Sequence, residues 1–264
     1  MDRVASIDRV AAALASFGVP GGLITQVPAL PGNATGLLMY GSQARGDAVE
    51  GSDLDLLALV PDPRPSIAAG DVSLSFYTPL QLRTGIGTLF GAHLRRDAKT
   101  LWDPTGRLHR IVGDMGQVDT SRLLTRAREM ASLFTTPEHD LPTYLPGLLR
   151  QARYLLRSSL YAEAISIGRP CFSVREIARR YDDETLVDLL ASRQSHPADL
   201  QDLTECLRRL DLLVHGFPPS KHGSLEATIV NEWGTPSDLL SAAFIALGST
   251  GSGSVYAEVA KILL

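Results

Sequence analysis

Apolar and polar residues follow two different patterns along this chain, and the pattern changes near residue 117. Before that point, short apolar runs bounded by glycine and proline predict three strands: 36–40, 54–60 and 71–78. The third run alternates strictly, with Val72, Leu74 and Phe76 between polar neighbours. Such alternation is typical of a strand that buries one face.

Helical spacing of apolar residues predicts the remaining elements. In the first part it indicates a helix over 3–16 and helices over most of 79–115, with a short strand at 99–103. After residue 117 only amphipathic helices are predicted: 121–134, 145–165, 173–181, 184–193 and 202–216. Ser173 and Glu176 have the spacing of a capping box that begins the third of these. A Gly/Ser-rich stretch at 248–254 predicts a flexible loop before a last short helix.

These patterns predict an α+β protein with two domains. Residues 1–117 are expected to form a small mixed β-sheet with helices, and residues 118–264 an all-helical domain. A length of 264 residues fits one large domain or two modest ones. The composition, 44% hydrophobic and 20% charged, is that of an ordinary globular protein.

Two features argue against a membrane or secreted protein. The uncharged stretch 10–44 contains several prolines and glycines, which a spanning helix does not carry together. Asp2 and Asp8 lie where a signal peptide is basic and then apolar. The two cysteines, Cys171 and Cys206, lack metal-site spacing and are expected to be buried thiols. We therefore expect a cytoplasmic protein that does not interact with membranes.

The charge distribution argues against a dedicated nucleic-acid binder. Residues 1–118 carry 10 basic and 11 acidic side chains, and residues 119–264 carry 15 and 18. Proteins that depend on phosphate-backbone contacts usually have a clear positive excess. Strong binding to duplex DNA is therefore not expected, although a local basic groove remains open.

The stretch from Met39 to Val60 carries the candidate chemistry. A predicted strand ends in Gly41-Ser42, whose backbone amides and hydroxyl are suited to contact phosphate oxygens. Asp53 and Asp55 follow at i, i+2 on the next strand, so both carboxylates project from one face, roughly 7 Å apart. This combination predicts a site for Mg²⁺ ions that bridge a nucleoside triphosphate and an attacking hydroxyl. The alternative is a solvated turn beside an acidic pair on an edge strand.

The segments Tyr-Gly-Ser-Gln-Ala-Arg-Gly (40–46) and Ser-Asp-Leu-Asp-Leu-Leu (52–57) resemble the signature of the DNA polymerase beta-like nucleotidyltransferase superfamily. The resemblance covers about residues 30–105 and is to the branch of minimal and aminoglycoside nucleotidyltransferases. It implies a small mixed sheet flanked by helices, often followed by a helical domain that closes the acceptor side.

The same resemblance implies roles for individual residues. Gly41 and Ser42 match the triphosphate-binding turn, and Asp53 and Asp55 match the metal-binding catalytic pair, with two Mg²⁺ ions expected. Arg45 follows the turn by three residues, where its guanidinium either contacts a phosphate or pairs with a nearby carboxylate, that of Asp47 or Glu50.

The sequence departs from the family at the third carboxylate, which the next strand usually supplies as metal ligand or general base. Ser73 occupies the expected position, and Asp71 lies on the same face two residues earlier. Three alternatives stay open: Asp71 fills the role from its shifted position, the base comes from the helical domain, or the enzyme is impaired. The catalytic set predicted here is Asp53, Asp55 and Asp71.

Three patterns in the helical part have a functional and a structural interpretation. Arg150, Arg153 and Arg157 share a helix face, which is either solvated or a lid that grips polyphosphate. Arg209 and His215 resemble the spacing of a family of small ribonucleases, and residues 173–193 resemble a helix-turn-helix. For both of these we favour the structural interpretation.

The function predicted is a Mg²⁺-dependent nucleotidyltransferase. It moves a nucleoside monophosphate from an NTP, with ATP expected, to a hydroxyl acceptor and releases pyrophosphate. The acceptor is a small molecule, a protein side chain or an RNA end. The alternatives are a catalytically weakened nucleotide-binding regulatory or antitoxin-like protein and a helix-turn-helix transcriptional regulator.

Overall fold

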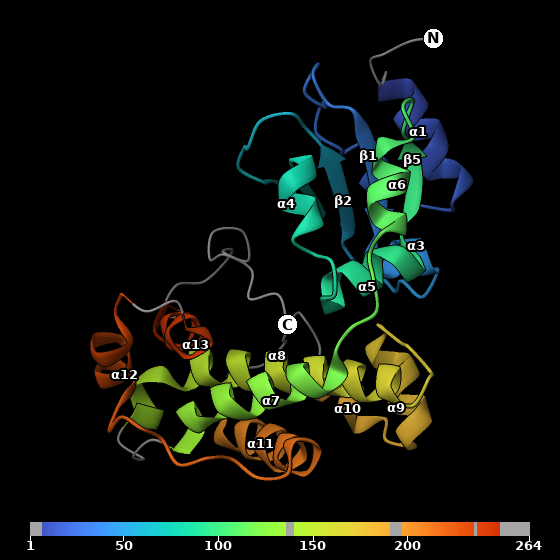
Figure 1. Ribbon diagram of the computed structural model, residues 1–264. Helices are drawn as coiled ribbons and strands as arrows, with labels where there is room; N and C mark the ends of the chain where they lie inside the picture. Colours follow the sequence, from blue (N-terminus) through green and yellow to red (C-terminus); the bar gives the residue numbers. More distant parts are fainter. Residues whose placement is uncertain (1–6, 136–139, 191–196, 235–236, 249–264) are drawn as a thin grey trace. The chain divides into compact units, whose positions relative to one another are not determined.

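The computed structural model describes residues 7–135, 140–190, 197–234 and 237–248 (Figure 1). It divides the chain into two compact units, Met1–Gln117 and Val118–Leu264. Four predicted features lie wholly or partly outside the described residues: the start of the helix at 3–16, the end of the helix at 184–193, the Gly/Ser-rich loop and the last helix.

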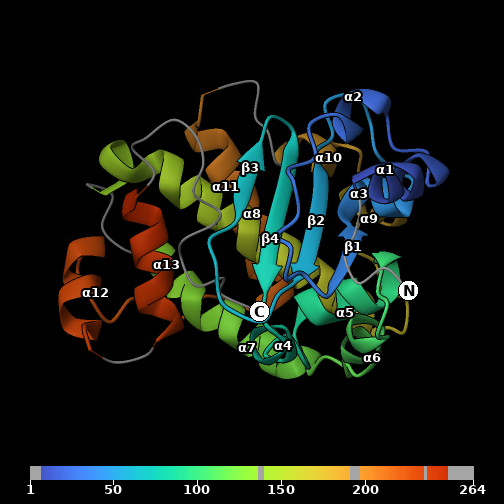
Figure 2. The same cartoon turned by 90° about the horizontal axis from the view of Figure 1, so that it is seen from above.

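The first unit is built on a five-stranded mixed sheet with the strand order β3-β4-β2-β1-β5 (Figure 2). Its strands are β1 (Gly36–Tyr40), β2 (Leu54–Leu59), β3 (Ile67–Ala69), β4 (Val72–Tyr77) and β5 (Lys99–Trp102). β2 and β4 run parallel, and the other three pairs are antiparallel. The prediction of a small mixed sheet is confirmed.

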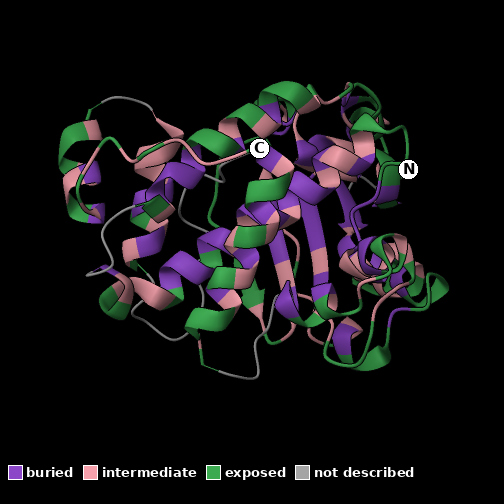
Figure 3. Cartoon of the chain, turned by 90° about the horizontal axis from the view of Figure 1, so that it is seen from below, coloured by how far each residue is buried: buried purple, intermediate pink, exposed green. Residues whose placement is uncertain are grey.

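The two faces of the sheet are covered by different helices. One face packs against α1 (Ile7–Ser16) and α2 (Gly21–Ile24), with Leu54, Leu56 and Ala58 of β2 in the shared core. The other packs against α4 (Pro79–Arg83), α5 (Leu89–Asp97) and α6 (Arg107–Gly113), with Leu57 and Leu59 of β2 in that core. Burying both faces of a strand explains why β2 is an almost continuous apolar run. Figure 3 shows the central strands as mostly buried.

Local capping interactions begin the helices of the second face. The Thr78 hydroxyl accepts a hydrogen bond from the Gln81 amide, and the Gln81 side chain accepts one from the Thr78 amide, which completes a capping box for α4. Thr88 caps α5 through the Gly91 amide. Such caps satisfy backbone donors that a helix leaves unpaired, and each contributes about 1 kcal/mol.

The second unit contains only helices among its described residues. They are α7 (Thr120–Met130), the 3₁₀ helix η1 (Ala131–Thr135), α8 (Leu141–Ser166), α9 (Val174–Tyr181), α10 (Thr185–Leu189), α11 (Leu200–Val214), α12 (Leu225–Glu232) and α13 (Asp238–Leu247). The long α8 packs against α7, α11 and α13, so its inward face is the centre of this unit. Cys171 and Cys206 are buried free thiols, as expected. The α+β fold class, a mixed sheet followed by a helical region, is confirmed.

No helix in the described part of the chain is long and apolar enough to cross a membrane.

Candidate active site

The turn from β1 into the short helix α3 (Gly41–Arg45) lies directly against β2. Tyr40, the last residue of β1, pairs in register with Asp55. Gly41 follows with a φ of +78°, and a Cβ atom there would lie 2.6 Å from Oδ2 of Asp55. Only glycine fits this conformation and this space. The two predicted parts of the site, the Gly-Ser turn and the second carboxylate, are therefore in contact.

The carboxylates of Asp53 and Asp55 belong to the segment that leads into β2 and to its second residue. Leu54 and Leu56 are buried in the core against α1 and α2, so Asp53 and Asp55 fall on the opposite side of the strand. Asp53 is exposed immediately before β2, and Asp55 is half-buried within it. Asp55 is therefore the carboxylate that lies against Gly41, and the charge of Asp53 acts on the neighbouring Tyr40, whose pKa it helps to raise.

The loop that carries Asp53 is held by α3. The side-chain amide of Gln43 donates a hydrogen bond to the Ser52 carbonyl (3.3 Å). The Ser52 hydroxyl accepts one from the backbone amide of Val49 (2.8 Å). Gln43 is itself buried, with 9% of its surface exposed. Gln43 was not among the site residues predicted from the sequence, and its position between Ser42 and Arg45 is its local signal.

The neighbouring strand β4 brings Ser73, and not a carboxylate, beside Asp55. The parallel pairing joins Asp55 with Ser73 and Leu54 with Val72. At the start of this pairing the Leu54 amide donates to the Asp71 carbonyl (2.9 Å). Asp53 and Asp71 each lie one residue before the first paired positions, Leu54 and Val72. The Asp71 amide in turn donates to Oε1 of Gln26 (2.9 Å), which holds the start of β4.

An aromatic cluster that the sequence analysis did not single out adjoins Asp55. The Tyr40 ring contacts Phe90 and His93 edge to face, both with centroids at 6.0 Å, and Tyr77 stacks on Phe90 at 5.9 Å. Burial and the nearby Asp55 carboxylate raise the pKa of Tyr40 well above its usual value. The phenol beside Asp55 is therefore neutral. The signal for this cluster was weak: Tyr40 directly precedes the Gly-Ser turn.

Arg45 of α3 is tied to α5 and to its own loop. Its Nε donates to Oδ1 of Asp47 (3.1 Å), and its Nη1 lies 3.1 Å from Nε2 of His93 and 3.8 Å from Oδ2 of Asp97. Burial and the Arg45 charge lower the pKa of His93 to about 3, so this imidazole is neutral and able to accept from the guanidinium. The pairing with Asp47 was one of the two interpretations of Arg45. Its contact with phosphate stays a prediction.

Residues 24–100 match the family model described as a nucleotidyltransferase domain. This part of the chain is a nucleotidyltransferase domain. The resemblance to the polymerase beta-like superfamily is thereby confirmed for the segment that contains Gly41, Asp53, Asp55 and Asp71.

Two solved structures are similar to the chain at low identity. One is a nucleotidyltransferase-like protein from Exiguobacterium sibiricum 255-15, at 15% identity, with 69% of each chain covered and a TM-score of 0.31. The other is a toxin-antitoxin structure with AMP-PNP, at 14% identity, with 42% of this chain and 84% of that chain covered and a TM-score of 0.25. The comparison with curated proteins found no match.

The donor set of the nucleotidyltransferase domain fits a magnesium ion. Mg²⁺ in nucleotide enzymes is usually held by one or two carboxylates, with substrate phosphates and waters as further ligands. Asp55 supplies a carboxylate against the turn at Gly41, and Asp53 supplies another two residues earlier in the chain. In the described residues no group of three acidic, histidine or cysteine side chains is gathered to hold a metal.

The basic residues singled out in the helical unit have structural partners. Arg153 donates to the Leu189 carbonyl (2.8 Å) and to Asp202 of α11. Arg209 pairs with Asp183 and with Glu205 (2.6 Å). α10, the second helix of the predicted helix-turn-helix, contains Asp188 and no basic residue. The contacts of Arg209 and the composition of α10 agree with the structural interpretations of the last two patterns. Arg153 is mostly buried and paired, so it does not belong to a solvated face.

Proposed function

We propose that the nucleotidyltransferase domain moves a nucleoside monophosphate from an NTP to the hydroxyl group of an acceptor and releases pyrophosphate. The observation that carries this proposal is the contact of the Gly41 turn with Oδ2 of Asp55, within a segment that matches the family. A backbone turn and a pair of carboxylates in contact are what a triphosphate and its counter-ions require.

The turn binds the triphosphate in this proposal. Without a Cβ at Gly41, the turn passes close to Oδ2 of Asp55. The backbone amides of the turn and the Ser42 hydroxyl are thereby next to the carboxylate that would hold the metal, and they would donate to the phosphate oxygens. Arg45, the last residue of α3, adds a positive charge close to the turn.

Asp53 and Asp55 would hold Mg²⁺, with two ions expected as in the family. When bound, the ions neutralise the charge of the phosphates and stabilise the attacking and leaving oxygens. Asp55 contributes by position, because it projects against Gly41 from a strand whose other residues are buried, and Asp53 directly precedes that strand. ATP is the NTP we expect.

Asp71 is the proposed general base. The acceptor oxygen attacks the α-phosphorus, the bond from the α-phosphorus to the bridging oxygen breaks, and the β- and γ-phosphates leave as pyrophosphate. The proton of the acceptor hydroxyl passes to the Asp71 carboxylate. Its place directly before β4 supports this role, because the Asp71 carbonyl accepts from the Leu54 amide and so lies next to the start of the strand that Asp53 precedes.

The proposal is tested by following label from NTPs. The purified protein is incubated with each α-³²P-labelled NTP, Mg²⁺ and fractions of small molecules, proteins and RNA. We expect transfer of label with ATP to one of these fractions and release of unlabelled pyrophosphate. The Asp55→Asn variant is the control and should transfer no label. Transfer by Asp55→Asn at the wild-type rate would contradict the proposed site.

One observation favours a second candidate, a domain that binds nucleotide for regulation without turnover. Ser73 lies beside Asp55 where the family usually has a carboxylate. A lost general base slows a reaction by about 10²–10⁴ and leaves binding intact. Saturable NTP binding by calorimetry, with no transfer to any acceptor fraction, would support this second candidate over the first.

A further inference from the structure

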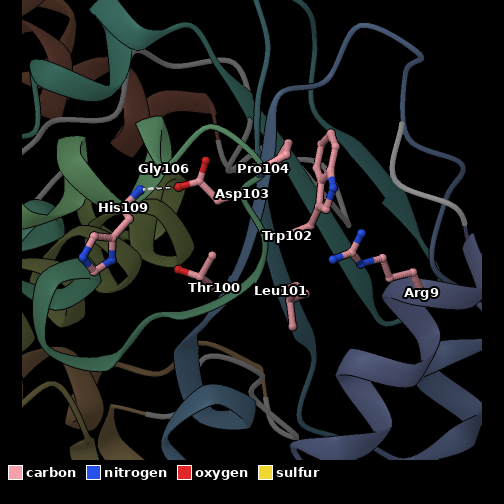
Figure 4. A pocket seen from close by; sticks show the side chains of 8 residues that line it. All are labelled: Arg9, Thr100, Leu101, Trp102, Asp103, Pro104, Gly106 and His109. Carbon is pink, nitrogen blue, oxygen red and sulfur yellow. Dashed lines mark hydrogen bonds between the residues drawn. The ribbon is translucent and has the colours of Figure 1, made fainter. Parts of the chain in front are cut away.

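A cavity of about 350 Å³ lies at the end of the edge strand β5, between α1 and the start of α6 (Figure 4). It is lined by Arg9 of α1, by Trp102 and Asp103 at the end of β5, and by Gly106 and His109. Sites for small molecules commonly have volumes of about 300–1,000 Å³. The space is therefore sufficient for a small metabolite.

This cavity is distinct from the candidate active site. Leu37, near the start of β1, pairs with Trp102, whereas the opposite end of β1 leads into Gly41. A strand rises about 3.3 Å per residue, so roughly 13 Å of strand separates Leu37 from Gly41. A ligand in the cavity would therefore not occupy the place of the triphosphate.

Trp102, which lines this cavity, carries a hydrogen-bond donor that no described residue accepts from. The residue is 4% exposed, and among the described residues its indole Nε1–H has no acceptor. Figure 4 shows the guanidinium of Arg9 extending toward the nitrogen-bearing side of the indole. Both groups are donors, so neither satisfies the other. An acceptor oxygen placed between them would bond to both, and leaving a buried donor unpaired costs about 1–3 kcal/mol.

Asp103, which also lines the cavity, has one carboxylate oxygen to which no described residue donates. Its Oδ2 accepts a hydrogen bond from the His109 amide (2.8 Å), which fixes the carboxylate against the first turns of α6. Its Oδ1 is buried and has no donor among the residues described. A ligand that reaches this oxygen must therefore supply an N–H or O–H group.

These two groups together define the chemistry of the ligand. A simple anion would accept hydrogen bonds from Trp102 and Arg9, but the negative charge of Asp103 would repel it. A simple cation would be attracted by Asp103 but repelled by Arg9, and it could not accept from Trp102. We propose that this cavity binds a small carboxylate that also carries an amino or hydroxyl group, as α-amino and α-hydroxy acids do. The ligand carboxylate accepts from Trp102 and Arg9, and its amino or hydroxyl group donates to Oδ1 of Asp103.

Entry of the ligand requires side chains that line the cavity to move, because Nε1 of Trp102 and Oδ1 of Asp103 are closed to water in the structure. Arg9, which lines the cavity next to Trp102, is an exposed residue with a long, flexible side chain. Its guanidinium would shift to make room for the carboxylate of the ligand and would then donate to it.

Tryptophan fluorescence provides the test. The chain has two tryptophans, so Trp233→Phe leaves Trp102 as the only one. Trp233 is 69% exposed, which makes this change well tolerated. The variant is titrated with the common α-amino acids, with lactate and malate, and with acetate, ammonium and inorganic phosphate. We expect a saturable change in Trp102 emission with at least one amino or hydroxy acid, and none with the last three probes.

Substitutions in the same background identify the contacts. Arg9→Gln removes a charge-assisted contact and should weaken binding about tenfold or more. Arg107→Gln, on an exposed arginine of α6 that does not line the cavity, should leave affinity unchanged. Asp103→Asn keeps the acceptor for the His109 amide but turns a donor toward the ligand. This variant should lose the preference for an amino or hydroxyl group over acetate.

Three outcomes would overturn the proposal. One is the absence of any emission change with the whole panel up to about 10 mM, tenfold above a 1 mM affinity. The second is equal binding of phosphate and the amino or hydroxy acids. The third is unchanged affinity in Arg9→Gln.

Discussion

The Cα atom of Gly41 faces the carboxylate of Asp55 so closely that a methyl group at Gly41 would lie 2.6 Å from Oδ2. Gly41 also has a φ of +78°, which residues with a side chain rarely adopt. Gly41→Ala should therefore destabilise the fold by about 1–3 kcal/mol and weaken NTP binding. Ser42→Ala, which loses one hydroxyl contact, should weaken binding less and leave stability nearly unchanged.

Calorimetric titration with ATP and Mg²⁺, beside thermal unfolding of each variant, measures both effects. Unimpaired titration of the two variants would count against the Gly-Ser turn as the triphosphate-binding element.

Asp53→Asn and Asp55→Asn should abolish Mg²⁺-dependent NTP binding or turnover while thermal stability changes little. The two carboxylates lie on one face and repel each other in the absence of a cation, so removing one charge does not weaken the folded state. NTP binding with and without Mg²⁺ is the measurement. Full activity in either variant would be incompatible with a metal-dependent transfer at this site.

Asp71→Ala distinguishes an enzyme from a nucleotide-binding protein. If Asp71 is the displaced third carboxylate, turnover should fall by about 10²–10⁴ with NTP binding retained. Ser73→Asn is the matched control for Ser73→Asp, because it changes the side chain beside Asp55 without adding a carboxylate. Unchanged turnover in Asp71→Ala, together with increased turnover in Ser73→Asp, would contradict the role of Asp71. It would show that the reaction needs a carboxylate at the position beside Asp55.

His93 should make the stability of the protein depend on pH. Its pKa is about 3 in the folded state and about 6.5 in the unfolded chain. Between these values the unfolded chain binds more protons, so stability rises with pH from about 3 to about 6.5. Melting temperatures from about pH 4 to pH 7 should rise less steeply in His93→Gln, whose side chain still accepts from Arg45.

An unchanged slope in His93→Gln would mean that another group titrates in this range.

Much of the site could be predicted because its parts are local in sequence. Alternation along 71–78 and the apolar run of β2 follow from strand geometry, and both were predicted. Asp53 and Asp55 share a face because side chains of a strand repeat every two residues. The site residues themselves remain predictions about function.

Some elements had too little local signal to be predicted. β3 has three residues, none of them buried, and it exists because it pairs with β4. α12 and α13 were not predicted. α13 is apolar on most of its surface, so no amphipathic repeat distinguishes it.

The sequence by itself determined the Gly-Ser turn and the acidic pair, because the residues of each lie close together in the chain. Local backbone geometry then decides which of their side chains share a face. The tertiary structure decided which groups meet across the sheet. The register of β2 with β4 brings Ser73 beside Asp55 and leaves Asp71 before the paired strand, with its carbonyl at the Leu54 amide. The packing of α5 brings His93 to Arg45, and the end of β5 brings Trp102 to Arg9. Pairing register and packing depend on contacts between distant segments, and a local pattern of residues does not specify them.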